Sequence, residues 1–150
     1  MKSFLCRAGR CGVLCSALLL VLILSACTHK VDNNGVYFFD GDAFRTTLKN
    51  SDDEMLKSIP EDVMAQTLDG LKDFKIEITQ DTQAVATFGD VVVKGTLAKI
   101  GVAGTESKFT MTPVDEDKKN DVVTLIVKDG SLILDPGKKE TDRMFFKKKS

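Results

Sequence analysis

The chain has little of the residue types on which most enzyme and metal sites depend. Its 150 residues include one histidine and no tryptophan. His29 is the only imidazole, so a zinc site with two histidines cannot be assembled, and because it lies in the predicted tether we expect no Ser-His-Asp triad within the domain. There is no G-x-S-x-G segment and no internal repeat. We therefore expect a protein that is not an enzyme and that holds no metal and no cofactor.

Cysteine is scarce in the part of the chain that could form a domain. Of the four cysteines, Cys6, Cys11 and Cys15 lie near the start, and Cys27 is the last in the sequence. If the chain is cut before Cys27, no intramolecular disulfide can form. An exported domain would then depend on apolar burial, which a chain of this size can supply without disulfides.

The first residues have the layout of a secretory signal. Lys2, Arg7 and Arg10 precede an apolar run over residues 13–24, and small residues follow it. This run is too short to span a bilayer, since a spanning helix needs roughly 20 apolar residues. The sequence therefore predicts a cleaved signal peptide over residues 1–26 and not a permanent transmembrane anchor.

The residues that end this signal are Leu24, Ser25, Ala26 and Cys27, and they resemble the lipobox of bacterial lipoproteins. The resemblance implies cleavage after Ala26, a diacylglycerol on the Cys27 sulfur and a further acyl group on the new amino terminus. Several acyl chains would hold the protein stably at a membrane, since each buried CH₂ contributes about 0.8 kcal/mol. By the enterobacterial sorting pattern, Thr28 after the cysteine implies an outer-membrane location facing the periplasm.

The expected mature chain is weakly acidic. Removal of the three basic residues of the signal leaves 18 basic and 22 acidic residues, a formal charge of about −4. This balance disfavours nucleic acid as a partner. The chain is locally basic at Lys147, Lys148 and Lys149, where lysines could meet anionic headgroups or keep a frayed end soluble.

Domain boundaries follow from these signals. Residues 27–35 are predicted to form a lipidated tether, since Asn33, Asn34 and Gly35 are typical of turns and short linkers. Residues 36–150 are long enough for one β-rich domain and short for two.

Two short helices are predicted after a first strand over residues 36–39. Ser51 with Glu54, and Ser58 with Glu61, have the spacing of capping boxes. The second helix has one apolar face that we expect to cover a sheet, and Gly70 is well placed to end it.

From Phe74 onward the hydrophobic period is two, which predicts strands. Phe74, Ile76 and Ile78 alternate with polar residues in a half-buried strand. Further strands are expected over residues 84–88, 91–100, 108–112, 121–127, 132–134 and 143–146. Asp129-Gly130 favours a type I′ turn, and Gly95 within a long strand indicates a bulge or a close backbone approach.

Together these elements predict an α+β, mostly β domain. We expect an antiparallel meander of about seven to eight strands curled over one or two short helices. In the order of its elements the chain resembles small bacterial envelope lipoproteins with lipocalin-like or half-barrel domains. This resemblance is one of layout and transfers no functional residue. A cystatin-like sheet wrapped around a helix fits the same pattern.

Few side chains stand out as candidate sites. Two groups of acids could offer oxygen ligands to calcium, but ordinary turn chemistry also explains them: Asp40 and Asp42, and Asp115, Glu116 and Asp117. Eight phenylalanines could either pack the core or line a cavity for an apolar ligand: Phe38, Phe39, Phe44, Phe74, Phe88, Phe109, Phe145 and Phe146.

These observations lead us to expect a membrane-anchored envelope lipoprotein that acts as a non-enzymatic binding or interaction module. Its partners would be the membrane, through the acyl chains on Cys27, and a protein or an apolar small molecule. One alternative is a lipocalin-like carrier of an apolar small molecule. The other is a periplasmic inhibitor of a lytic enzyme, in which the loop over residues 113–120 would enter the active site.

Overall fold

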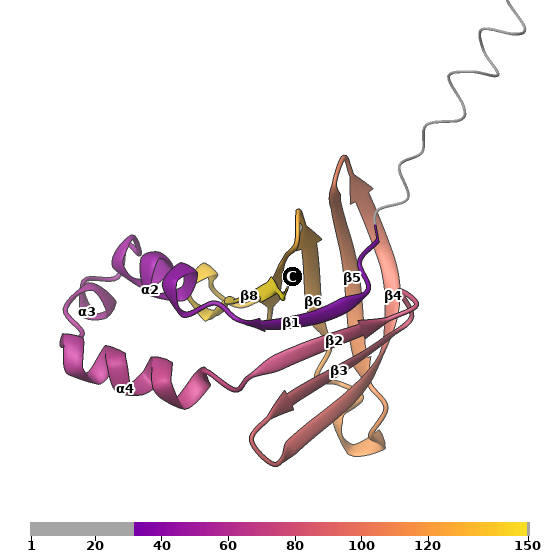
Figure 1. Ribbon diagram of the computed structural model, residues 1–150, viewed down its shortest axis with the longest axis horizontal. Coiled ribbons are helices and arrows are strands. Elements are labelled where there is room, and N and C mark those ends of the chain that lie inside the picture. The colour runs from indigo at the N-terminus through magenta and orange to yellow at the C-terminus, as the bar shows by residue number, and fades with distance from the viewer. Residues whose placement is uncertain (1–31, 150) are drawn as a thin grey trace, which may run out of the picture. The chain divides into compact units, whose positions relative to one another are not determined.

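The alternating segments of the sequence form the strands of a closed antiparallel β-barrel in the computed structural model, which describes residues 32–149 (Figure 1). The strands are β1 (Gly35–Phe39), β2 (Lys75–Thr79), β3 (Gln83–Phe88), β4 (Val91–Ala103), β5 (Glu106–Pro113), β6 (Val123–Lys128), β7 (Ser131–Asp135) and β8 (Met144–Lys148). Each strand pairs with the next, and β1 also pairs with β8, where Tyr37 lies opposite Lys148. The predicted meander is therefore confirmed. Its closure is consistent with the lipocalin-like expectation and not with an open, cystatin-like sheet.

Three helices occupy the connection between β1 and β2: α2 (Gly41–Lys49), α3 (Glu54–Lys57) and α4 (Glu61–Leu71). They lie beside the barrel, at the end of β1 and the start of β2 (Figure 1). The principal contact with the barrel joins α2 to β8, and α4 packs on α2. The expectation that the second helix covers a sheet is therefore not met. A closed barrel buries the inner face of its sheet on itself, so it needs no helix to cover that face.

Helices α2 and α3 begin at aspartates, and none of the three helices begins at a predicted capping box. The side chain of Asp40 accepts a hydrogen bond from the Ala43 N–H at 3.0 Å, which starts the unpredicted helix α2. Asp53 caps α3 in the same way, accepting from the Met55 N–H at 3.0 Å. Ser51 lies two residues before Asp53 and accepts a hydrogen bond from the Asp53 N–H, so it is not the cap.

The ends of α3 and α4 also differ from the prediction. Ser58 is the C-cap of α3, and α4 begins after Pro60 without a side-chain cap. Proline suits this place because its fixed φ is compatible with a helix start and its missing N–H is not needed there. Gly70 lies within α4, which continues to Leu71.

Side chains from all eight strands fill the barrel. The inward positions form one apolar cluster that consists of Tyr37, Ile76, Ile78, Ala84, Leu97, Phe109, Met111, Leu125, Val127, Leu132 and Phe146. A void that could hold a water molecule would leave part of the surrounding side chains accessible. Ile76, Phe109, Leu125 and Leu132 are fully inaccessible. No water-sized void therefore lies beside these four residues.

The structure decides two predictions that involve glycines, the turn at Gly130 and the bulge or close approach at Gly95. Asp129 and Gly130 both have positive φ (48° and 78°), as a type I′ turn requires. Gly95 is a point of close approach, because a Cβ there would lie 2.6 Å from the Met111 Cγ. The irregularity in β4 lies further along, where the pairing with β5 shifts between Lys99 and Gly101.

The two ends of the barrel carry different loops. The N-terminal end comprises residues 32–34, the β2–β3 turn (residues 80–82), the outer part of the β4–β5 hairpin (residues 99–108), the β6–β7 turn with its flanking residues (128–131), and residues 147–149. The helical end comprises the three helices, the β3–β4 turn and the β5–β6 and β7–β8 loops.

Candidate functional site

The predicted lipidation site lies outside the described residues. Leu24, Ser25, Ala26 and Cys27 all precede Asp32, where the description begins, and so does His29. The roles of these residues, and the boundary of the predicted tether, stay predictions.

Residues 32–34, which we call the N-terminal arm, bind the β2–β3 turn. Asn33 is fully buried, and its Nδ2 donates to the Asp81 Oδ2 at 3.3 Å. The Asp81 N–H in turn donates to the Asn34 Oδ1 at 3.1 Å. The Tyr37 hydroxyl donates to the Asn33 carbonyl at 2.8 Å. These bonds connect the arm to the inside of the barrel and close the N-terminal end with polar groups.

The Tyr37 phenol belongs to this closure and is poorly suited to proton transfer. Burial, together with the nearby carboxylates of Asp32 and Asp81, raises the pKa of Tyr37 to about 12. A general acid or base works best when its pKa lies near the working pH. The phenol therefore acts as a neutral hydrogen-bond donor.

Lysines gather at the N-terminal end. A cleft of about 350 Å³ lies between the β6–β7 turn and the end of β8, lined by Asp129, Gly130, Ser131, Lys147, Lys148 and Lys149. The Lys148 N–H donates to the Gly130 carbonyl at 2.8 Å and the Lys149 N–H to the Val36 carbonyl at 3.3 Å. These lysines therefore belong to or directly continue β8 and are not a frayed end.

Two lysines of this end lie over aromatic rings. The Lys149 Nζ is 5.4 Å from the centre of the Phe38 ring, and the Lys99 Nζ is 5.6 Å from that of Phe109. Such contacts hold the aliphatic stem against the protein while the ammonium group stays in water.

The β4–β5 hairpin extends beyond its neighbours at the N-terminal end (Figure 1). The pairing of β4 with β3 reaches only to Thr96, whereas its pairing with β5 continues to Ala103. Ile100 and Val102 lie on this extension, and each is 59% exposed. The hairpin therefore presents two β-branched apolar side chains to solvent beside the lysines.

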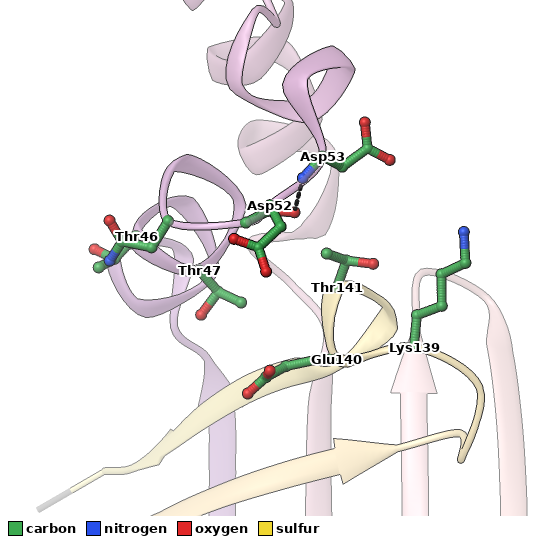
Figure 2. Close-up of a pocket in the computed structure, with 9 residues that line it drawn as sticks. Thr46, Thr47, Asp52, Asp53, Lys139, Glu140 and Thr141 are labelled. Atoms are coloured by element: carbon green, nitrogen blue, oxygen red, sulfur yellow. Dashed lines mark hydrogen bonds between the residues drawn. The ribbon is translucent and has the colours of Figure 1, made fainter.

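A polar cleft of about 460 Å³ lies at the helical end, between the α2–α3 connection and the short 3₁₀ helix η2 (Glu140–Asp142) (Figure 2). Its lining residues are Thr46, Thr47, Asn50, Ser51, Asp52, Asp53, Lys139, Glu140 and Thr141. Figure 2 shows the Asp52 carboxylate pointing toward the space between Thr47 and Thr141.

The acids of this polar cleft mostly have structural partners. Asp53 caps α3, and the Glu140 Oε1 pairs with the Arg143 Nη1 at 3.1 Å. The lining residues include no histidine and no cysteine. The cleft can therefore hold polar groups through hydroxyls and the Asp52 carboxylate, but it offers no pair of a nucleophile and an imidazole base.

The acids that sequence reasoning considered for calcium do not converge. Asp40 caps α2 and Asp42 lies in its first turn. Around the 3₁₀ helix η1 (Glu116–Lys118), Asp115 and Glu116 pair with lysines three residues later, at 4.0 and 2.7 Å. Within residues 32–149, no group of three or more His, Cys, Asp or Glu side chains is placed to hold a metal ion.

The phenylalanines fall into three environments. Phe109 and Phe146 are core residues, and Phe39 and Phe74 pack edge-on against Phe146. Phe38, Phe44 and Phe145 are half-buried, outside the core cluster. Phe88 is 44% exposed at the helical end and contacts Phe74, with 5.7 Å between ring centres.

An apolar rim, which the sequence did not reveal, surrounds the β3–β4 turn and the β5–β6 loop. It consists of the exposed residues Phe88, Val91, Val92, Val114 and Val122. The predicted inhibitory loop belongs to the same region: Pro113 is buried at the end of β5, and residues 114–120 are exposed. A role for this loop in inhibition stays a prediction.

Residues 32–149 form no helix with the length and apolar character needed to cross a membrane. Comparison with known proteins finds no matching family model, curated protein or solved structure.

Proposed function

We propose that the chain is exported, cleaved before Cys27 and lipidated there, and that its barrel serves as a non-enzymatic binding module on the membrane. The observation that carries the proposal is the sequence Leu24, Ser25, Ala26 and Cys27 after a charged start and an apolar run. In a cell with two membranes, Thr28 favours the outer membrane and the periplasmic side.

The barrel supports binding more than catalysis. Its interior is occupied by core side chains, and its distinctive features lie outside the core: a lysine-lined cleft, a projecting apolar hairpin and an apolar rim. Exposed apolar groups that cluster on a protein surface commonly mark interaction sites. The polar cleft contains acids, but most of them serve as caps or ion-pair partners.

The carrier alternative receives no support from the packing. An apolar ligand inside the barrel would have to displace residues such as Phe109 and Leu125, which are fully buried. Lipocalin-type carriers instead keep an open interior that holds one small ligand. We therefore place the binding surface on the outside of the barrel.

Lipidation is tested by expressing the full chain in a bacterium and measuring the intact mass of the membrane-bound product. The expected product begins at Cys27 and carries acyl chains. Cys27→Ala should lose both the acyl mass and the membrane attachment. Cys15→Ala is the matched control, since it removes a cysteine of the same leader and leaves the lipobox intact. An acyl mass that persists in Cys27→Ala, or that is missing from the wild type, would refute the anchoring.

The binding role is tested by native mass spectrometry of the protein isolated from its own envelope. A module of the proposed kind should retain a stable partner at a defined ratio. A retained apolar small molecule would instead favour the carrier. Conversion of a substrate by the purified protein would contradict the non-enzymatic role, and reduced activity of a lytic enzyme at excess protein would favour the inhibitor.

A further inference from the structure

The N-terminal end of the barrel is the part that a lipid on Cys27 would hold nearest the membrane. An extended chain spans at most about 3.6 Å per residue, so Asp32 can lie no more than roughly 18 Å from Cys27. The N-terminal arm cannot lengthen this tether freely, because Asn33 is buried and Asn34 bonds to the β2–β3 turn. This step, and the inference that follows from it, rests on the proposed anchoring at Cys27.

Charge is distributed unequally between this end and the rest of the described chain. The N-terminal end carries six lysines, Lys99, Lys108, Lys128, Lys147, Lys148 and Lys149, and four acids, Asp32, Asp81, Glu106 and Asp129. This is an excess of two positive charges. The remaining residues from 36 to 143 carry eleven basic and eighteen acidic side chains, an excess of seven negative charges. Because charges are screened over about 8 to 10 Å, an anionic surface acts mainly on the side chains nearest to it. Such a surface near Cys27 would attract the N-terminal end and would repel the acidic remainder if that part approached it.

The lysine cleft gives this attraction a defined place. Lys147, Lys148 and Lys149 line a space of about 350 Å³ in which Asp129 is the only acid. Lys147 and Lys148 belong to β8, and main-chain hydrogen bonds hold Lys148 and Lys149 to the β6–β7 turn and β1. Ammonium groups presented by an ordered strand can meet phosphate groups with little loss of backbone entropy.

The hairpin next to this cleft is suited to the apolar side of a membrane interface. β5 pairs with β6 up to Lys128, so the cleft and the β4–β5 hairpin are separated only by neighbouring strands. Ile100 and Val102 project from the hairpin, each 59% exposed. Apolar residues beside basic ones are the combination by which peripheral segments bind anionic bilayers.

We propose that the N-terminal end of the barrel docks on an anionic phospholipid surface. The lysines of β8 contact phosphate headgroups, and the tip of the β4–β5 hairpin enters the interfacial layer with Ile100 and Val102. Docking orients the barrel so that its acidic helical end, with the apolar rim and the polar cleft, faces away from the membrane. The lipid then supplies attachment, and the protein surface supplies orientation.

The test uses the acylated protein reconstituted in vesicles. Because the lipid consumes Cys27, a cysteine introduced into the mature chain is its only free thiol. An environment-sensitive fluorophore is attached to Ile100→Cys and, as the matched control, to Val92→Cys, which is similarly exposed at the helical end. On vesicles that contain anionic phospholipid, the label at position 100 should shift to the blue and be protected severalfold from an aqueous quencher. The label at position 92 should remain fully quenchable.

A charge variant tests the headgroup contact. At about one kcal/mol per lysine near a charged surface, replacing Lys147 and Lys149 with glutamine should lower the docking equilibrium roughly thirtyfold. The control is Lys118→Gln with Lys119→Gln, which removes the same charge from the helical end and should leave the protection at position 100 unchanged. Vesicles made only of neutral phospholipid should lower the protection at position 100 at least as much as the replacement of Lys147 and Lys149 does.

Failure of this inference is distinguishable from failure of the anchoring. If the intact mass shows acyl chains but the two labels are quenched equally, docking is refuted and lipidation stands. If the mass shows no acyl chains, the anchoring is refuted, and docking is then decided by sedimentation of the same protein with anionic vesicles. Co-sedimentation that the Lys147 and Lys149 variant lacks would support docking. An absence of co-sedimentation would refute it.

Discussion

The two ends of one barrel are closed by different chemistry. At the N-terminal end a buried asparagine, a tyrosine hydroxyl and a turn aspartate form directional hydrogen bonds. At the helical end the closure is apolar. The seven half-buried residues that pack against the core are Phe39, Phe74, Ala86, Val93, Val123, Leu134 and Met144, and they face this end.

This difference makes the two ends of a regular meander chemically distinct. Hydrogen bonds to buried groups are costly to leave unmade, so they fix one arrangement of the N-terminal arm. Apolar contacts at the helical end depend on area and tolerate substitution better. The polar closure fixes the position at which residues 32–34 join the barrel. The apolar closure leaves exposed apolar side chains at the helical end that are available for contact.

The largest expected effect is a difference in the free energy of unfolding between a core variant and a variant of the apolar rim. Phe109→Ala should lower the free energy of unfolding by about 3 to 5 kcal/mol, because the site is fully buried and a cavity would remain. Phe88→Ala should cost less than about 1 kcal/mol, since that ring is 44% exposed. Urea denaturation of both variants measures the difference. Equal losses would show that the rim is as tightly packed as the core.

The next effect tests the polar closure through pH. The neutral phenol of Tyr37 is favoured in the folded state, where its pKa is about 12, over the unfolded state, where it is near 10. Between these values the folded protein binds more protons, so stability should fall as pH rises, by about 1.4 kcal/mol per unit. Tyr37→Phe should lose this part of the slope.

The reference for this measurement is the wild type over the same alkaline range, so that the titration of lysines cancels in the difference. At neutral pH the Tyr37→Phe variant should be less stable by about 1 to 3 kcal/mol, because the Asn33 carbonyl loses its donor from the phenol. Parallel curves for the two proteins above pH 10 would contradict the buried-phenol account.

A smaller effect is expected at the helical end. The Gly137 N–H, at 2.8 Å from the Asp135 Oδ1, and the Arg143 side chain hold the pKa of Asp135 below its ordinary value. The stability from this group should therefore be present at neutral pH and be lost as pH falls toward the lowered pKa. Asp135→Asn should cost about 1 kcal/mol at neutral pH and nothing in strong acid. Denaturation at several pH values measures it, with Asp142→Asn as the control, and a difference that does not change with pH would contradict the explanation.

The strands were predictable because their side chains alternate between a filled interior and solvent. Phe74, Ile76 and Ile78 face inward, as their spacing indicates. Closure was not predictable from local pattern, since it depends on β1 meeting β8 at the far end of the chain. Helix α2 was missed although Asp40 is a good cap, because its few apolar residues lie among polar ones and it buries only Leu48.

The surfaces that we propose for binding were harder to predict from the sequence than the strands. The run of lysines 147–149 was noticed, but the β6–β7 turn that completes its cleft lies elsewhere in the chain. Burial of Asn33 could not be read from a polar segment that looks like a linker. Ile100 and Val102 resembled ordinary strand residues, and only the shorter reach of β3 leaves them exposed.

The pairing of β1 with β8 also determines when the molecule can finish folding. A chain that leaves a ribosome or an export channel from its N-terminal end presents β1 first and β8 last. Until residues 144–148 emerge, β1 has a partner on one side only and β7 lacks its second neighbour. Such open edges can pair with other chains. The barrel therefore cannot close until β8 has emerged. Before that point the unpaired edges of β1 and β7 are most exposed to chaperones and proteases.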